Sequence, residues 1–251
     1  AGGGVLGWIV AQRVQMTEAL IEAEKMRAEL ELARVVQMST LPATMPVLAG
    51  YEAFGCFEPA ELTGGDTFDL SIVDGQLLVV LGDATGHGIA PALSVTQMHA
   101  MLRMAFRLGA DLEAAFAQVN DQLADTLPDD RFITAFIGLL DPATHRLRFV
   151  SAGQGPILHY QAAAGSFARY PPTSFPLGAM HLPARRAAAA LELLPGDLLL
   201  LLSDGIYEQH DAQGEMFGEE RVEQLVREHG NAPMAELSAR LLAAVQAFAR
   251  G

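Results

Sequence analysis

The sequence predicts an α+β fold in which pairs of helices pack on antiparallel sheets. Three observations lead to this prediction: several segments form strand-turn-strand units, two pairs of helical segments separate or follow them, and 51% of the 251 residues are apolar. That apolar content is sufficient for one large core. We therefore expect a linker helix over residues 1–40 and a single domain over residues 41–251.

The N-terminal segment is expected to be one long helix. From Gln12 to Met38 it contains no Pro or Gly and is rich in strong helix formers, and the prolines of LPATMP at residues 41–46 end it. Arg27 and Arg34 interrupt an otherwise heptad-like apolar seam. Two interpretations stay open: the helix packs on the core of its own domain, or it pairs with a second copy to form a signalling homodimer.

The first ten residues, AGGGVLGWIV, are apolar but shorter than the about 20 residues that span a bilayer. We expect a junction here rather than the end of a membrane helix, and both the presence and the absence of an upstream sensor or membrane domain stay open. Cys56 is the only cysteine, which excludes an internal disulfide and a thiolate zinc site and fits the cytoplasm. The net charge of -14 argues against nucleic-acid binding, because phosphate contacts need clusters of Lys and Arg.

The strands and helices of the domain follow in order. Asp74-Gly75 separates TFDLSIV from QLLVVLGD, a strong hairpin signal because both turn positions must tolerate positive φ. Helical periodicity then covers residues 91–109 and 111–127, the second opening on the cap residue Asp111. Two more hairpins, a buried strand and two final helices are expected at residues 131–153, 157–170, 197–205, 219–228 and 234–249.

Two acidic residues are expected to face each other at the open end of the first hairpin. With Asp74 and Gly75 in the turn, opposed positions sum to 149, which pairs Asp66 with Asp83. Like charges at such positions destabilise a sheet, so the pair needs a cation, a shared proton or a loop that separates the side chains. Asp204, between an apolar strand and a glycine, adds a third carboxylate in a similar position.

Oxygen ligands of this kind suit Mg²⁺ or Mn²⁺ rather than Zn²⁺. Glycines at positions 64, 65, 82, 86 and 88 surround the opposed acids and allow an ion or a phosphate to approach the backbone. Two such ions about 3.5 to 4 Å apart activate a water and neutralise phosphoryl oxygens, which indicates hydrolysis of a phosphate ester. Each Asp-Gly pair alone is better explained as an ordinary turn, and only the combination favours a site.

Six motifs occur in an order that resembles one family of enzymes. They are GGDTFDL, GDATGHGIAPAL, RFITAFIGLLD, SAGQGPILHY, FPLGAM and PGDLLLLLSDGIYEQHDAQGEMFG. Together they look like the SpoIIE/RsbU branch of the metal-dependent (PPM, type 2C) serine/threonine protein phosphatases, from about Glu31 to the C-terminus. The resemblance implies a PPM-type α-β-β-α sandwich, in which two stacked antiparallel sheets are flanked by helix pairs.

The resemblance also implies roles for the acidic residues. Asp66 and Asp83 would be the catalytic metal ligands, with Asp83 bridging two Mn²⁺ or Mg²⁺ ions, and the Ala84 carbonyl and Asp204 would be further ligands. The implied substrate is a phosphorylated anti-anti-sigma protein of the STAS type, dephosphorylated on Ser or Thr. A metal-activated water would attack phosphorus without a covalent phosphoenzyme, in the output domain of a bacterial signalling protein.

Two departures from the branch bear on activity. The usual Asp-Asp-hydrophobic-Thr motif near the final strand, which supplies another carboxylate ligand, does not occur before the chain stops at AAVQAFARG. Gln154 stands where the branch often has histidine, and we expect this change to tune the chemistry rather than abolish it. The alternative function is a degenerate or truncated phosphatase domain that binds a partner without turnover.

Three further residue types have ordinary explanations. His87 is expected to be an exposed loop residue without a direct metal role. His99 is expected to be a packed or partly exposed helix residue, and the methionines at positions 98, 101 and 104 are expected to belong to the core.

Overall fold

The computed structural model describes the backbone of residues 3–59 and 62–251, and side chains from residue 16 onward within these ranges. The helices are α1 (Gly3–Thr40), α2 (Ile89–Arg107), α3 (Leu112–Thr126), α4 (Asp204–Tyr207), α5 (Gly218–His229) and α6 (Met234–Arg250). The strands are β1 (Asp66–Val73), β2 (Gln76–Ala84), β3 (Ile133–Asp141), β4 (Arg146–Ala152), β5 (Ile157–Gln161), β6 (Ser166–Tyr170), β7 (Ala189–Glu192) and β8 (Leu198–Leu201).

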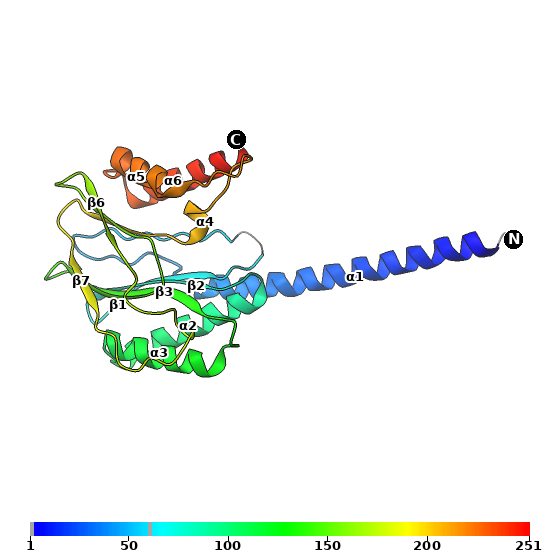
Figure 1. Ribbon diagram of the computed structural model, residues 1–251, viewed down its shortest axis with the longest axis horizontal. Helices are drawn as coiled ribbons and strands as arrows, with labels where there is room; N and C mark the ends of the chain where they lie inside the picture. Colours follow the sequence, from blue (N-terminus) through cyan, green and yellow to red (C-terminus); the bar gives the residue numbers. More distant parts are fainter. Residues whose placement is uncertain (1–2, 60–61) are drawn as a thin grey trace.

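Two antiparallel sheets lie between two pairs of helices (Figure 1). The larger sheet has the strand order β1-β2-β3-β4-β7, and the smaller has the order β6-β5-β8. α2 and α3 cover the outer face of the larger sheet, while α5 and α6 cover the smaller one (Figure 1). The predicted α+β sandwich of two antiparallel sheets with flanking helix pairs is confirmed.

Alternation of side chains along β2 explains why the larger sheet is covered on both faces. Leu78 and Val80 pack in the cluster under α2 and α3, whereas Leu77 packs in the cluster between the sheets. The inter-sheet cluster is centred on Phe136 and Phe149, whose rings stack with centroids 5.2 Å apart. Each strand face is therefore buried against a different layer, and the ends of the strands remain for a site.

The first hairpin has the predicted turn and register. Asp74 and Gly75 occupy the turn with φ of 48° and 79°, the positive values that a two-residue hairpin turn requires. The resulting register pairs Asp66 with Asp83 and Val73 with Gln76. A one-residue slip would move every side chain to the opposite face, so this turn also fixes which side chains reach the end of the hairpin.

Most of the expected helices lie where the sequence predicts them, within two residues of each expected end. Asp111 caps α3 as expected, since its Oδ1 accepts a hydrogen bond from the Ala114 backbone N–H at 2.6 Å. Met98 is fully buried, but Met104 is 55% exposed, so its expected place in the core is wrong. Met104 lies on the face of α2 that turns away from the sheet.

The strands near the C-terminus depart more from expectation. β8 covers only Leu198–Leu201, and Asp204 begins the short helix α4 instead of ending the strand. β7, which pairs with β4 at the edge of the larger sheet, was not predicted. The second and third hairpins are present as β3–β4 and β5–β6.

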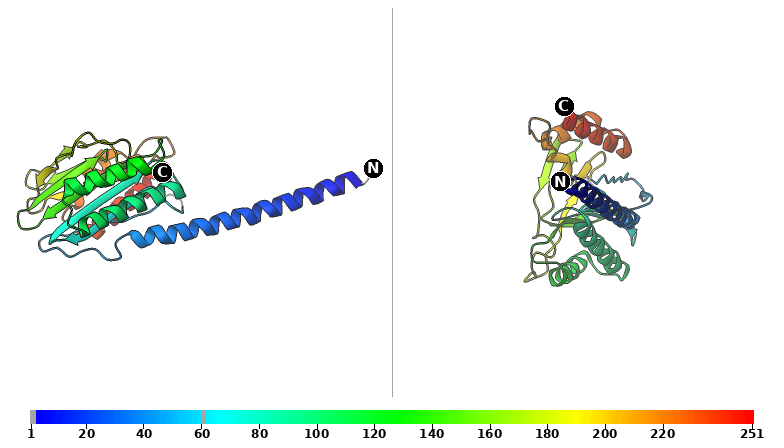
Figure 2. Two further views of the ribbon diagram at one scale, coloured as in Figure 1. Left: turned by 90° about the horizontal axis from the view of Figure 1, so that it is seen from below. Right: turned by 90° about the vertical axis from the view of Figure 1, so that its right-hand side faces the viewer.

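α1 extends away from the sandwich as a long, projecting helix (Figure 2). Its predicted helical character is confirmed, and it begins before the expected Gln12. We expected residues 1–10 to form a junction rather than the end of a membrane helix. The side chains of these residues lie outside those that the structure describes. Among the described residues, no helix is both long and apolar enough to cross a membrane.

Candidate active site

The open end of the β1–β2 hairpin carries two of the predicted acids. Asp66 is the first residue of β1, and the register places it opposite Asp83, the next-to-last residue of β2. On its other side Asp83 is paired with Thr134 of β3. Asp83 therefore lies in the interior of the sheet, with Asp66 on the strand to one side.

Burial and like charge raise the pKa values of both carboxyl groups. Desolvation is the largest cause of the rise of the Asp83 pKa to about 7, followed by the charges of Asp66 and Asp204. The pKa of Asp66 is also raised, mainly by burial, although a hydrogen bond with Ser203 opposes the rise. A proton or a cation is therefore needed to relieve the repulsion between these acids.

Asp204 approaches the same place from the smaller sheet. It is the first residue of α4, which follows β8 after Leu202 and Ser203. Its charge raises the pKa values of both Asp66 and Asp83, so the three carboxylates lie within electrostatic reach of one another. The structure thus brings together two acids of the larger sheet and one that follows the last strand of the smaller sheet.

Gly65 allows the chain before β1 to approach the end of β2. The Ala84 backbone N–H donates a hydrogen bond to the Gly65 carbonyl at 3.0 Å. A Cβ atom at position 65 would lie 2.6 Å from the Ala84 carbonyl oxygen and 3.2 Å from Oδ1 of Asp83. Only glycine fits this close approach without displacement, and the Ala84 carbonyl consequently lies beside the acids.

The end of α1 holds the segment that leads into Asp66. The Gln37 side-chain amide donates to the carbonyls of Gly64 at 2.6 Å and Asp66 at 3.2 Å, and it accepts from the Gly64 backbone N–H at 3.2 Å. Arg34 adds a hydrogen bond to the Leu62 carbonyl at 3.3 Å. These contacts were not predicted, because a polar residue on a helix gives no signal of the strand that it meets.

Replacing Gln37 with Leu is expected to lower the free energy of unfolding by about 1 to 3 kcal/mol, because it leaves buried backbone groups without partners. Gln37 is only 2% exposed, so water cannot easily substitute for the amide. Urea denaturation measures the effect. Glu29→Ala, an exposed position on the same helix, is the control and should change stability by less than about 0.5 kcal/mol; equal losses in the two variants would contradict the role of the amide.

Two histidines lie near this region in the sequence, one in a loop and one on a helix. His87 is exposed in the loop before α2, as expected. His99 is buried on α2, and its Nε2 lies 3.5 Å from Oδ2 of Asp69. Asp69 also accepts two hydrogen bonds from Arg103, at 2.6 and 2.7 Å. This cluster joins β1 to α2 and satisfies a buried carboxylate.

The donor atoms at the site fit a hard divalent cation. Oδ1 of Asp66 is buried without a hydrogen-bond partner among the described residues, and its neighbours are carboxylate and carbonyl oxygens of the kind that Mg²⁺ and Mn²⁺ prefer. Within residues 16–59 and 62–251, however, no group of three or more His, Cys, Asp or Glu side chains is arranged to hold a metal ion. The unpartnered Oδ1 of Asp66 is thus the structural feature that most directly indicates a cation site.

Comparison with known proteins identifies one family and several relatives. The family model described as Stage II sporulation protein E (SpoIIE) matches residues 73–251. The phosphoserine phosphatase RsbP of Bacillus subtilis is 26% identical over 226 residues, which cover 88% of this chain and 53% of RsbP. Protein IcfG of Synechocystis is 25% identical over 224 residues, which cover 78% of this chain and 35% of IcfG. The chain therefore spans about half or less of these relatives.

The fold is also found in solved structures. The PP2C domain of SiaA from Pseudomonas aeruginosa superposes with a TM-score of 0.76 at 21% identity, covering 91% of this chain and 92% of that domain. An identity this low shows a shared fold. Because the family model covers more than half of the sequence and the architecture agrees, this chain belongs to the SpoIIE family and has the PP2C phosphatase fold.

Proposed function

We propose that this chain is a metal-dependent serine/threonine protein phosphatase, with the catalytic domain at residues 41–251 and a linker at residues 1–40. The observation that carries the proposal is the pairing of Asp66 with Asp83 in register, within reach of the Asp204 charge. Acids held this close are costly unless a cation balances them. Cations bound there would neutralise the oxygens of a phosphate ester, and Gly86 and Gly88 lie in the loop that directly follows β2.

Asp66, Asp83, the Ala84 carbonyl and Asp204 would hold two Mn²⁺ or Mg²⁺ ions. When bound, such ions activate a water and neutralise the oxygens of the phosphoryl group. The chain itself fixes the position of Asp83 between Asp66 and Thr134 in the sheet. A distant relative in fold supports the choice of ion: the catalytic domain of PstP, 16% identical with a TM-score of 0.51, was solved with two manganese ions.

The proposed substrate is phosphoserine or phosphothreonine on a regulatory protein, specifically a STAS-type anti-anti-sigma protein in the cytoplasm. The name of the relative RsbP, a phosphoserine phosphatase, supports the phosphoserine part of this proposal. We also propose that α1 pairs with a second copy. Its support is the set of exposed apolar side chains along the projecting helix, namely Met16, Leu20, Ile21, Met26, Leu32, Val35 and Val36.

Hydrolysis of p-nitrophenyl phosphate, and then of a phosphoserine STAS protein, tests the proposal as Mn²⁺ is titrated from zero. We expect no turnover in EDTA and saturable turnover with Mn²⁺. A folded chain that binds Mn²⁺ but hydrolyses neither substrate would favour the alternative, a partner-binding module without catalysis. A folded chain that binds no Mn²⁺ would overturn the proposed ligands.

A further inference from the structure

Gln154 lies buried in the segment that crosses from one sheet to the other. β4 of the larger sheet ends at Ala152, and β5 of the smaller sheet begins at Ile157. Gln154 is only 3% exposed. A buried amide must find partners for both its donor and its acceptor. One partner of Gln154 lies in β3 of the larger sheet, and the other directly follows β8 of the smaller sheet.

Each end of the amide binds next to one of the acids. Nε2 donates to the Leu202 carbonyl at 2.9 Å, two residues before Asp204. Oε1 accepts from the Thr134 hydroxyl at 3.0 Å. Thr134 is the partner of Asp83 in the sheet, and its hydroxyl oxygen lies 3.4 Å from the Asp83 carbonyl oxygen. The amide therefore links Thr134, the sheet partner of Asp83, to Leu202, two residues before Asp204.

The backbone around Gln154 is held as well. Ser151 donates its hydroxyl hydrogen to the Gln154 carbonyl at 2.6 Å. The hydroxyl of Tyr207, the last residue of α4, donates to the Gly155 carbonyl at 3.0 Å. The crossing segment is thus anchored to β4 and to the helix that begins with Asp204. With its backbone anchored, the reach of the Gln154 side chain sets the spacing of the elements that it joins.

We infer that Gln154 is a positioning residue whose amide fixes the separation of Asp83 and Asp204 and thereby sets the affinity for the metal ions. This inference rests on the proposed function. Thr134 and Leu202 are the partners of the two polar atoms of the Gln154 amide, so Gln154 would act on ion binding through them rather than as a ligand. Its influence would pass through Thr134 beside Asp83 and through the Leu202–Ser203 segment that leads into Asp204.

The position needs a donor and an acceptor on one uncharged side chain. Met is similar in length to Gln and carries no charge, but it supplies no N–H donor and only a weak acceptor. Neutral His keeps one N–H donor and one nitrogen acceptor. Gln154→Met therefore removes the bridge without adding charge beside the acids, and Gln154→His is the variant that restores it.

Isothermal titration of the substrate-free chain with Mn²⁺ is the first measurement. Gln154→Met is expected to weaken Mn²⁺ binding about tenfold to a hundredfold, the usual range for groups that orient metal ligands. Gln154→His is expected to recover most of the wild-type affinity. Hydrogen exchange supplies a second readout, in which residues 202–207 of the metal-free Met variant should exchange faster than those of the wild type.

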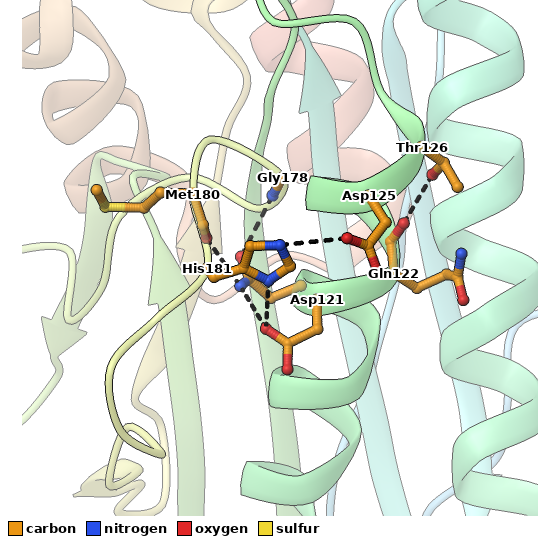
Figure 3. A network of polar contacts seen from close by, with 8 residues as sticks. Asp121, Gln122, Asp125, Thr126, Gly178, Met180 and His181 are labelled. Carbon is orange, nitrogen blue, oxygen red and sulfur yellow. Dashed lines mark hydrogen bonds and ion pairs between the residues drawn. The ribbon is translucent and has the colours of Figure 1, made fainter.

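Asn120 provides a matched control for the loss of a buried amide. Its Nδ2 donates to the Met180 carbonyl at 3.0 Å, and its Oδ1 accepts from the Gly178 backbone N–H at 3.3 Å. These bonds join α3 to the loop that contains Gly178 and Met180. Figure 3 shows Gly178 and Met180 beside α3. Asn120→Leu is expected to lower stability while leaving Mn²⁺ affinity at the wild-type value.

The outcomes separate this inference from the function on which it rests. If Gln154→Met loses stability but binds Mn²⁺ like the wild type, Gln154 is a structural residue and the inference is overturned. Equal losses of affinity in Gln154→Met and Asn120→Leu would overturn it too, because any destabilising change would then suffice. If the folded wild-type chain binds no Mn²⁺, the proposed function itself fails, and the inference fails with it.

Discussion

Asp83→Asn is expected to reduce Mn²⁺-dependent hydrolysis by more than about a hundredfold, since a direct ligand should matter at least as much as the groups that orient ligands. The same change should raise the melting temperature of the metal-free protein. It removes a charge from a place where burial, Asp66 and Asp204 raise the pKa to about 7. Loss of activity together with a gain in metal-free stability is the signature of a ligand, because a damaged core would lose both.

The measurements are kcat/KM at saturating Mn²⁺ and the melting temperature in EDTA at pH 8. Asp74→Asn is the matched control, because it makes the same change at the opposite end of the same hairpin. Asp74 has φ of 48°, which Asn tolerates, so both quantities should stay near the wild-type values. Full activity of Asp83→Asn would remove Asp83 from the proposed site.

Mn²⁺ affinity is expected to fall about tenfold for each pH unit below 7, because a proton on Asp83 must leave before an ion can bind. The folded-state pKa of about 7 lies above the ordinary value of 3.8. Between about pH 4 and pH 7, Asp83 of the folded, metal-free chain therefore holds a proton that Asp83 of the unfolded chain has already released. The stability that this proton contributes is present at low pH and is lost as the pH rises from about 4 to about 7.

Comparison of the wild type with Asp83→Asn in EDTA isolates this contribution from those of other acids. The stability advantage of the Asn variant should grow between pH 4 and pH 7 and then level off. Calorimetric titrations with Mn²⁺ at several pH values measure the binding part of the prediction. An affinity that stays constant between pH 5.5 and pH 7.5 would contradict it.

The hairpin was predictable because its determinants are local. Two turn residues with positive φ set the register, and the register alone places Asp66 opposite Asp83. The approach of Asp204 depends instead on how two sheets pack. No local periodicity specifies that packing, and at the level of the sequence only the order of six motifs implied it.

Features that depend on contacts with distant parts of the chain could not be predicted from the sequence. β7 (Ala189–Glu192) comes from an alanine-rich stretch with weak strand propensity and exists through its pairing with β4. Gln37 is polar and lies in a helix that is mostly exposed, yet it is buried against the chain before β1. In both cases the partner, and not the residue's own preference, determines the structure.

The three acids of the site come from distant parts of the sequence, and this affects how the protein folds. Strands β1 to β4 contain Asp66 and Asp83, whereas Asp204 follows β8, so the early strands alone cannot complete the set. Contacts between segments this distant in sequence form only after large loops close, which costs entropy and slows folding. Strong ion binding would therefore arise only once the sheets have docked. Mn²⁺ would then act as a ligand of the finished fold and favour it over partly folded chains by mass action.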